Sequence, residues 1–373
     1  MVIRYYELAS ANHSPSVGAT WEDWDLTASG VPGNCVAEIL AIYPRIDAGS
    51  ALEAYPGVRE NGSALTRTTV LSSYMSVAQM AVFRVNVDID GVIEIYDNYL
   101  LFPVIPHCVF RVIGYFTGAT YTETVITLND GDGAWTEDDL FTDHSIPKGS
   151  VIDVMMGVGD EFGVQEIGLR SQGAVGRTYL MKDVWYVYGY NTVSVFETTN
   201  TVNGKIETYC DDDAYVTFKC FGYWDQSVEY TVVHDILVPS GAASWVDYDL
   251  DTHSVPTKTV AVIVLFNRED DTANICGVRE DGSSLTRYVA IDWGEYVDPD
   301  YFATCMTMCV EVLGVDSRIE LYTTDTTYAW MYIDGYLNTK GRLGKIDGIA
   351  IADIAKIDGI SVIDILGINN IPI

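Results

Sequence analysis

The pattern of polar and apolar positions along the chain is dominated by runs of strand-forming residues. Residues 82–89 alternate apolar with polar side chains, as a half-buried strand does. Residues 36–43 and 260–266 are rich in β-branched and other strand-forming residues. Clusters of Gly, Asn, Asp and Pro interrupt such runs about every 8–12 residues, and no long stretch has a 3.6-residue apolar period. The pattern predicts an all-β protein.

A set of short sequence motifs is repeated three times along the chain. A short signature, Gly-Val-Arg-Glu-Asn-Gly-Ser in its first copy, is found at 57–63, 168–174 and 277–283. A Trp precedes each copy, at Trp21, Trp135 and Trp245, and these residues are 114 and 110 positions apart. An Ile-Glu-x-Tyr element and a Gly-Tyr pair follow each signature. A repeat of this length has the size of a domain and is too long for a solenoid unit.

The repeat predicts three tandem modules and a separate tail. We expect β-sandwich or jelly-roll modules at residues 1–117, 118–226 and 227–340, because about eight strands fit into each. Apolar residues form 48% of the chain, enough for each module to have its own core. Residues 341–373 differ abruptly in composition and form the tail.

Each module contains one Arg and one Glu that we expect to form a structural ion pair. The predicted pairs are Arg59 with Glu94, Arg170 with Glu207, and Arg279 with Glu320. The glycine three residues after each of these arginines suits a turn that needs a positive φ angle. A ligand site present in three copies would give the same pattern.

The charge of the chain limits its partners. The 53 acidic and 21 basic residues give a formal net charge of −32. Phosphate backbones and anionic lipids repel such a protein, so we expect neither nucleic acid nor membrane as a partner. Acidic surfaces suit saline surroundings or the binding of divalent cations. The acidic clusters at 137–139, 211–213 and 269–271 lack the spacing of a calcium loop and are predicted to be solvated loops.

No pattern in the sequence indicates catalysis, a metal centre or a cofactor. The seven cysteines do not align between the modules, which favours buried free thiols over shared disulfides or zinc sites. His144 and His253 align before a proline, but the first module has Ser29 there, which indicates a turn. Nucleophile elbows, His-Glu-x-x-His pairs and P-loops are missing. We expect no enzyme, although a glycosidase could use two of the many carboxylates.

The N-terminal residues bear on localisation. They lack a basic region followed by an apolar core, and the chain has no 18-residue apolar run. Extracellular-type β modules without an export signal are typical of proteins made in the cytoplasm and released by lysis, as virion proteins are. We therefore expect a virion or an extracellular assembly; a cleaved precursor would look the same.

The tail consists of 11-residue repeats. Residues 345–355 and 356–366 share the pattern Lys-Ile-Asp-Gly-Ile, and 367–373 are a partial third copy. An 11-residue period can indicate a right-handed helical supercoil, but the Gly and β-branched content favours strands. We expect strand addition to a sheet edge, in this chain or in a neighbour. The apolar positions predicted to make this contact are Ile346, Ile349, Ile351, Ile354, Ile357, Ile360, Val362 and Ile365.

The tail resembles the Lys-Ile-x-Gly-[Ile/Val]-Ala-x-Ala-x-Ile repeats at the ends of many structural proteins of tailed phages. The tandem β modules are also similar to phage head-fibre, decoration and tail proteins, which are strings of small sandwiches. The resemblance implies a structural role in a virion and carries over no functional residues.

Two functional hypotheses follow from the sequence. The first is a self-assembling structural protein of a virion or extracellular filament, whose modules pack side by side and whose tail docks on a neighbouring copy or on another virion or filament protein. The second is an array of carbohydrate-binding modules, as in an adhesin or a receptor-binding protein, with some of the 8 Trp and 25 Tyr residues stacking on a glycan. Solvent-facing aromatic rings would favour the second hypothesis.

Overall fold

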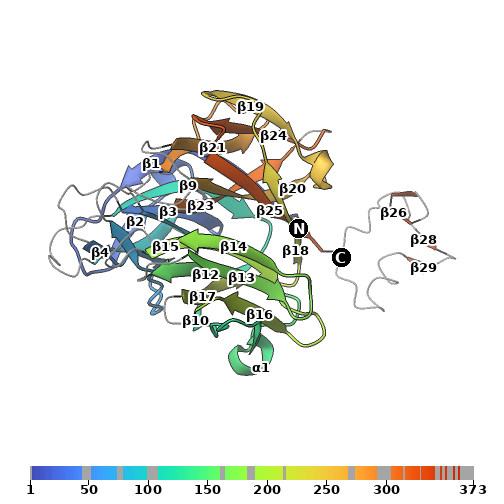
Figure 1. The fold of residues 1–373 in the computed structure, drawn as a ribbon, viewed down its shortest axis with the longest axis horizontal. Coiled ribbons are helices and arrows are strands. Elements are labelled where there is room, and N and C mark those ends of the chain that lie inside the picture. The colour runs from blue at the N-terminus through green and yellow to red at the C-terminus, as the bar shows by residue number, and fades with distance from the viewer. Residues whose placement is uncertain are drawn as a thin grey trace.

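The chain folds into antiparallel β-sheets, with few and short helices (Figure 1). The structure is a computed structural model, and it describes residues 2–43, 52–73, 79–98, 108–159, 164–182, 190–212, 216–267, 274–291, 304–313, 316–327 and 329–340, with four short strands beyond them. The sequence-based prediction of an all-β protein is confirmed.

Residues 1–117, called module 1 below, contribute nine strands within the described ranges. They are β1 (Arg4–His13), β2 (Glu22–Asp25), β3 (Val36–Tyr43), β4 (Leu52–Ala54), β5 (Gly57–Glu60), β6 (Leu71–Ser73), β7 (Gln79–Asn86), β8 (Val92–Tyr96) and β9 (Val109–Thr117), with the 3₁₀ turn η1 (Thr27–Ser29). The predicted strand at 36–43 coincides with β3, and the one at 82–89 overlaps β7 but extends three residues too far.

In the part of the chain that the structure describes, residues 118–226 (module 2) and 227–340 (module 3) form eight strands each. Module 2 contains β10 (Tyr121–Thr127), β11 (Thr136–Asp139), α1 (Leu140–His144), β12 (Val151–Gly159), β13 (Val164–Ser171), β14 (Arg177–Lys182), β15 (Tyr190–Thr198), β16 (Lys205–Cys210) and β17 (Val216–Trp224). Module 3 contains β18 (Val228–Leu237), β19 (Ser244–Asp249), η3 (Leu250–His253), β20 (Thr259–Asn267), β21 (Asn274–Glu280), β22 (Tyr288–Ile291), β23 (Thr304–Val312), β24 (Arg318–Thr323) and β25 (Ala329–Thr339).

The strand order is that of a jelly roll. In module 2 the two sheets are β10-β17-β12-β15 and β11-β16-β13-β14, and module 3 has the same order in β18-β25-β20-β23 and β19-β24-β21-β22. Module 1 has β1-β9-β3-β7 opposite β2-β8-β5, and a single bridge from Gly57 to Thr68 stands where the fourth outer strand begins in the other modules. We call the sheets with β7, β15 and β23 axial and the others outer.

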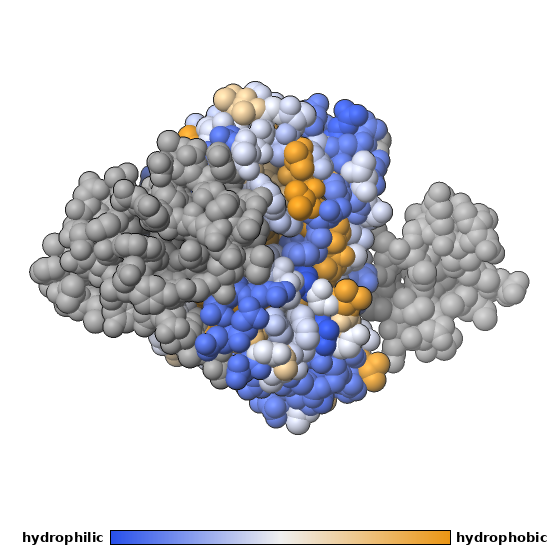
Figure 2. Space-filling model, in the orientation of Figure 1, coloured by the Kyte–Doolittle hydropathy of each residue, from blue (hydrophilic) through white to orange (hydrophobic). Residues whose placement is uncertain are grey.

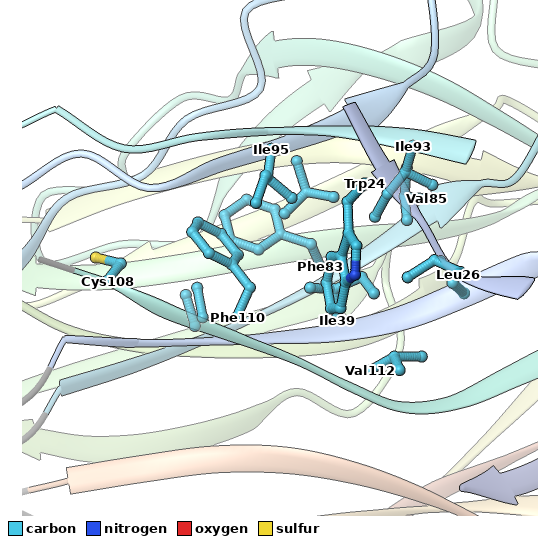
Figure 3. Close-up of a cluster of buried hydrophobic side chains, with 14 of the residues drawn as sticks. Trp24, Leu26, Ile39, Phe83, Val85, Ile93, Ile95, Cys108, Phe110 and Val112 are labelled. Carbon is cyan, nitrogen blue, oxygen red and sulfur yellow. The ribbon is translucent and has the colours of Figure 1, made fainter. Parts of the chain in front are cut away.

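Apolar side chains of the two sheets meet inside each module. In module 1, Trp24, Ile93 and Ile95 of the outer sheet face Phe83 and Phe110 of the axial sheet, as Figure 3 shows. Alternation along each strand produces this core because every second side chain points inward.

The three modules surround a common axis. The edge strands β7, β15 and β23 contact one another, so the three axial sheets meet at the centre of the molecule. In Figure 1, β15 and β23 lie in the middle, with β19, β21 and β24 of module 3 above them and β13 and β16 of module 2 below. The chain therefore has approximate threefold symmetry.

Each module completes the core of another one. Met155 and Phe221 of module 2 lie in the core of module 1, and Val264 and Phe266 of module 3 lie in that of module 2. The core of module 3 in turn contains four residues of module 1: Leu40, Met80, Val82 and Ile113. A fourth core lies around the axis and combines equivalent side chains of all three modules, including Tyr5, Tyr121 and Tyr230.

The tail forms short strands, as expected. β26 (Lys345–Ile346) pairs with β27 (Ile349–Ala350), and β28 (Lys356–Ile357) pairs with β29 (Ile360–Ser361), all antiparallel. Each of the two full 11-residue repeats thus contains one pair of antiparallel strands, and each strand is two residues long.

Candidate functional site

The structure brings together the three predicted Arg–Glu pairs on the outer sheets. Arg59 Nε lies 2.7 Å from Glu94 Oε2, Arg170 Nε 2.6 Å from Glu207 Oε2, and Arg279 Nε 2.7 Å from Glu320 Oε2. In each pair the two residues lie directly opposite on adjacent strands. The turn glycines that follow, at positions 62, 173 and 282, have the predicted positive φ, between 73° and 75°.

Each of these pairs also covers a tryptophan. The guanidinium carbon lies 4.0 Å from the ring centroid of Trp21, 4.1 Å from that of Trp135 and 4.2 Å from that of Trp245. A tyrosine packs beside each Trp with centroids 5.2–5.5 Å apart: Tyr96, Tyr209 and Tyr322. One face of each Trp ring is thus taken by a cation and is not open to a sugar.

A second set of arginines links the modules in a closed ring. Arg67 of module 1 reaches Glu123 of module 2 at 3.2 Å, and Arg177 of module 2 reaches Asp334 of module 3 at 3.1 Å. Arg287 of module 3 returns to Glu7 of module 1 at 3.0 Å. All three guanidinium groups are buried. The sequence shows these arginines at equivalent positions but gives no sign that they bind the next module.

The same arginines also hold the axial strands. Arg67 donates to the carbonyl of Arg84, Arg177 to that of Phe196, and Arg287 to that of Cys309. The latter three residues are equivalent, because they lie opposite Glu38, Asp153 and Val262, which occupy the same place on β3, β12 and β20.

A buried tyrosine completes each junction. Tyr5 donates to Glu38 at 2.7 Å, Tyr121 to Asp153 at 3.2 Å, and Tyr230 to Asp334. Burial raises the pKa of all three hydroxyls well above the ordinary value, so they are neutral donors.

In module 3, the carboxylate that accepts a hydrogen bond from the buried tyrosine lies on a different strand from that in modules 1 and 2. Glu38 and Asp153 lie on β3 and β12, opposite Gly114 and Gly222, but the equivalent residue on β20 is Val262. Asp334, next to Gly335 on β25, accepts from the tyrosine instead. The buried contact is therefore preserved although the residue that provides it has moved.

One cation occupies the axis itself. Arg84 donates to Glu38 at 2.8 Å and to Asp153 at 3.2 Å, and it lies 4.6 Å from the ring centroid of Phe196 and 3.7 Å from Cys309 Sγ. Burial alone would lower the pKa of the guanidinium, but Asp153 and Glu38 outweigh it and raise the pKa. The result is a buried network that joins all three modules.

The candidate metal-ligating side chains and the cysteines can be placed within the described residues. Within them, no group of three or more His, Cys, Asp or Glu side chains is arranged to hold a metal ion. All seven cysteines are buried and unbonded to each other, and burial raises the pKa of Cys305, as it does that of Cys35. No helix in the described ranges is both long and apolar enough to cross a membrane.

The predicted tail contacts are only partly placed. Ile346, Ile349, Ile357 and Ile360 lie in β26, β27, β28 and β29. Ile351, Ile354, Val362 and Ile365 lie outside the described residues. The surface on which the tail docks stays a prediction.

Comparisons with known proteins return only distant similarities. No family model and no curated protein matches the chain. A solved tandem of two carbohydrate-binding domains from Paenibacillus barcinonensis Xyn10C is 9% identical, covering 60% of this chain and 90% of that one, with a TM-score of 0.20. A structure described as the triple jelly roll fold and turret assembly of an archaeal virus is 10% identical, covering 91% and 89%, with a TM-score of 0.19. The major coat protein described as STIV MCP is 8% identical, covering 59% and 96%, with a TM-score of 0.26. TM-scores this low place the chain in none of these families.

Proposed function

We propose that this chain is a structural subunit of a virion, which assembles with copies of itself or with other virion proteins. The observation that carries this proposal is the closed ring of three jelly-roll modules, joined by the buried contacts of Arg67, Arg177 and Arg287. In the ring, the inner surfaces of the modules pack against one another. The outer surfaces, called the flanks below, are similar in the three modules and face solvent.

A block with three similar flanks suits a repeating assembly. Shells and lattices are built from contacts that recur in several directions around symmetry axes. A single chain with threefold-like shape can present related surfaces in three directions without first forming a trimer.

The surface is consistent with controlled association. Figure 2 shows a mostly hydrophilic face with a narrow line of hydrophobic residues along its middle. Exposed apolar residues include Val232, Ile236 and Val238 on or just after the edge strand β18. High net negative charge opposes random aggregation, so copies associate only where specific contacts overcome it.

The alternative carbohydrate-binding role has less support. A sugar platform needs an open ring face, and Arg59, Arg170 and Arg279 each occupy one face of a repeated tryptophan. The proposal includes no catalytic step.

The test compares the full chain with residues 1–340 by light scattering and electron microscopy. We expect ordered assemblies of the full chain, and weaker assembly with unchanged folding when residues 341–373 are missing. If both forms stay monomeric at every concentration, the structural role is wrong, and binding to a glycan array becomes the next experiment.

A further inference from the structure

Among the described residues, an open hollow lies at the rim of the junction between modules 1 and 3 and of that between modules 1 and 2. The first lies between modules 1 and 3 and is small and open to solvent; it is lined by Leu8, Arg111, Ile113, Tyr288 and Val289, among others. The second lies between modules 1 and 2 and is also small and open to solvent. Its lining includes Thr69, Val70, Met155, Gly157 and Lys219.

The two hollows carry a cation at the same place in the fold. Arg111 lies opposite Leu40, and Lys219 lies opposite Met155, at the fifth position of β3 and β12. The equivalent residue in module 3 is Tyr332, opposite Val264. Its ring stacks on His234, with centroids 5.7 Å apart, so an aromatic pair stands at this junction instead of a cation.

Arg111 has no partner within the described part of the chain. Its side chain is half-buried, and its buried Nε has no acceptor. Every other described arginine except the exposed Arg318 forms an ion pair with a carboxylate: Arg4, Arg59, Arg67, Arg84, Arg170, Arg177, Arg279 and Arg287. Because the side chain of Arg111 lines the open hollow and forms no hydrogen bond or ion pair within the described residues, it is suited to an acceptor from outside the chain.

Lys219 is in a similar situation. Its Nζ donates only to the carbonyl of Thr68, at 3.3 Å, and it has no carboxylate partner among the described residues. Burial lowers the pKa of this amine. A carboxylate beside it would counteract that effect, because an opposite charge favours the ionised form.

We propose that Arg111 and Lys219 form two equivalent binding sites for carboxylate side chains of a neighbouring copy of this chain. This inference rests on the proposed function and specifies how copies meet. Copies with a formal charge of −32 repel each other, and their surfaces are rich in carboxylates. A contact between copies therefore needs cations that are not already neutralised within the fold, and these two cations meet that condition.

The walls of the first hollow favour such a contact. Leu8, Ile113, Val289 and Met308 are apolar, and a bound side chain would displace water from them. A charge-assisted hydrogen bond is stronger where water is excluded, and a guanidinium can bind a carboxylate through two parallel hydrogen bonds.

The experiment measures self-association of the full chain by sedimentation velocity at low and high salt. The variants are Arg111→Gln and Lys219→Gln, and Arg318→Gln is the matched control because it removes the same charge from an exposed position. We expect each of the first two to raise the concentration needed for assembly about tenfold, and the control to leave it within about twofold. Arg111→Lys and Lys219→Arg should restore most of the assembly.

The possible outcomes separate this inference from the proposed function. If the unaltered chain does not assemble, the structural role fails, and the contact between copies fails with it. If the chain assembles but both Gln variants need the same concentration for assembly as the parent, the proposed binding sites at Arg111 and Lys219 are wrong and the structural role stands. The same holds if the Arg318 control weakens assembly equally. If sodium acetate raises the melting temperature of the parent chain but not of Arg111→Gln, while assembly is unchanged, the site binds a small free carboxylate and the neighbouring copy is overturned as its source.

Discussion

Arg84 illustrates how a single residue can hold several modules together. It lies between Glu38 of its own module and Asp153 of the next one, and it contacts Phe196 and Cys309. The periodicity of the sequence predicts that position 84 is polar in a strand, but an isolated strand gives no sign of its partners. The partners lie 46, 69, 112 and 225 residues away in sequence, which follows from their residue numbers.

Removing this charge should be far more costly than removing an outer-sheet arginine. Arg84→Met leaves two buried carboxylates without their cation, so we expect a loss of about 3–5 kcal/mol in the free energy of unfolding. Arg59→Gln breaks a partly exposed pair and should cost about 1–2 kcal/mol. Urea denaturation followed by circular dichroism measures both. Equal losses would show that the axial network does not depend on this cation.

Asp138 predicts a specific dependence on pH. Burial raises its pKa from the ordinary value of 3.8 to about 6, although the backbone amide of Asn129 donates to it. The folded protein therefore binds this proton more tightly than the unfolded chain does, and stability falls as the pH rises from about 4 to about 6. Asp138→Asn cannot ionise. We expect this variant to gain about 1–3 kcal/mol relative to the parent at pH 7.5, and little at pH 4. A gain that is the same at both pH values would contradict the assignment.

At the scale of strands, the Gly-Tyr pairs that mark the end of each repeat receive a physical explanation. A Cβ atom at Gly222 would lie 2.2 Å from the hydroxyl of Tyr121 on the neighbouring strand β10. The glycine thus makes room for a tyrosine that binds Asp153, a buried carboxylate of the axial network.

Gly222→Ala should therefore displace Tyr121 and lower the free energy of unfolding by about 2–4 kcal/mol. Gly241→Ala is the control, because a Cβ there would meet its nearest neighbour at an ordinary 3.7 Å. Thermal melting of both variants checks the expectation. A destabilised Gly241→Ala, or an unaffected Gly222→Ala, would refute it.

The sequence is most informative at the level of elements. Alternation and turn residues indicate the strands and the positive-φ turns, and cross-strand neighbours such as Arg59 and Glu94 can be expected from repetition. Their pairing is local to one sheet. Tyr5, Tyr121 and Tyr230 occupy equivalent positions and could have been recognised by aligning the repeats, but nothing in a strand pattern shows that they face another module.

At the scale of the molecule, the ring makes the modules depend on each other. Met155 is a residue of module 2 that lies in the core of module 1. A boundary drawn between repeats in the sequence thus separates residues that share one core, and the closure of three repeats into a ring is determined by side chains about one repeat apart.

This dependence predicts cooperative unfolding. We expect one calorimetric transition for the whole ring. Met155→Ala should lower the transition temperature of all three modules together, because it opens a cavity worth about 2–4 kcal/mol across a junction. Separate transitions in the parent chain, or a shift confined to one part of the melting curve of the variant, would contradict this expectation.

The axis also bears on why three similar modules are present in one polypeptide. Three identical subunits around an axis must place the same side chain there three times, and three guanidinium groups would repel one another. When the three modules belong to one chain, equivalent positions on the axis need not carry the same side chain. The central position can then hold one cation, one aromatic ring and one thiol, as Arg84, Phe196 and Cys309 do. Linkage of three modules in one chain thus permits a chemically mixed centre that no homotrimer could have, and it also allows the outer surfaces of the modules to differ from one another.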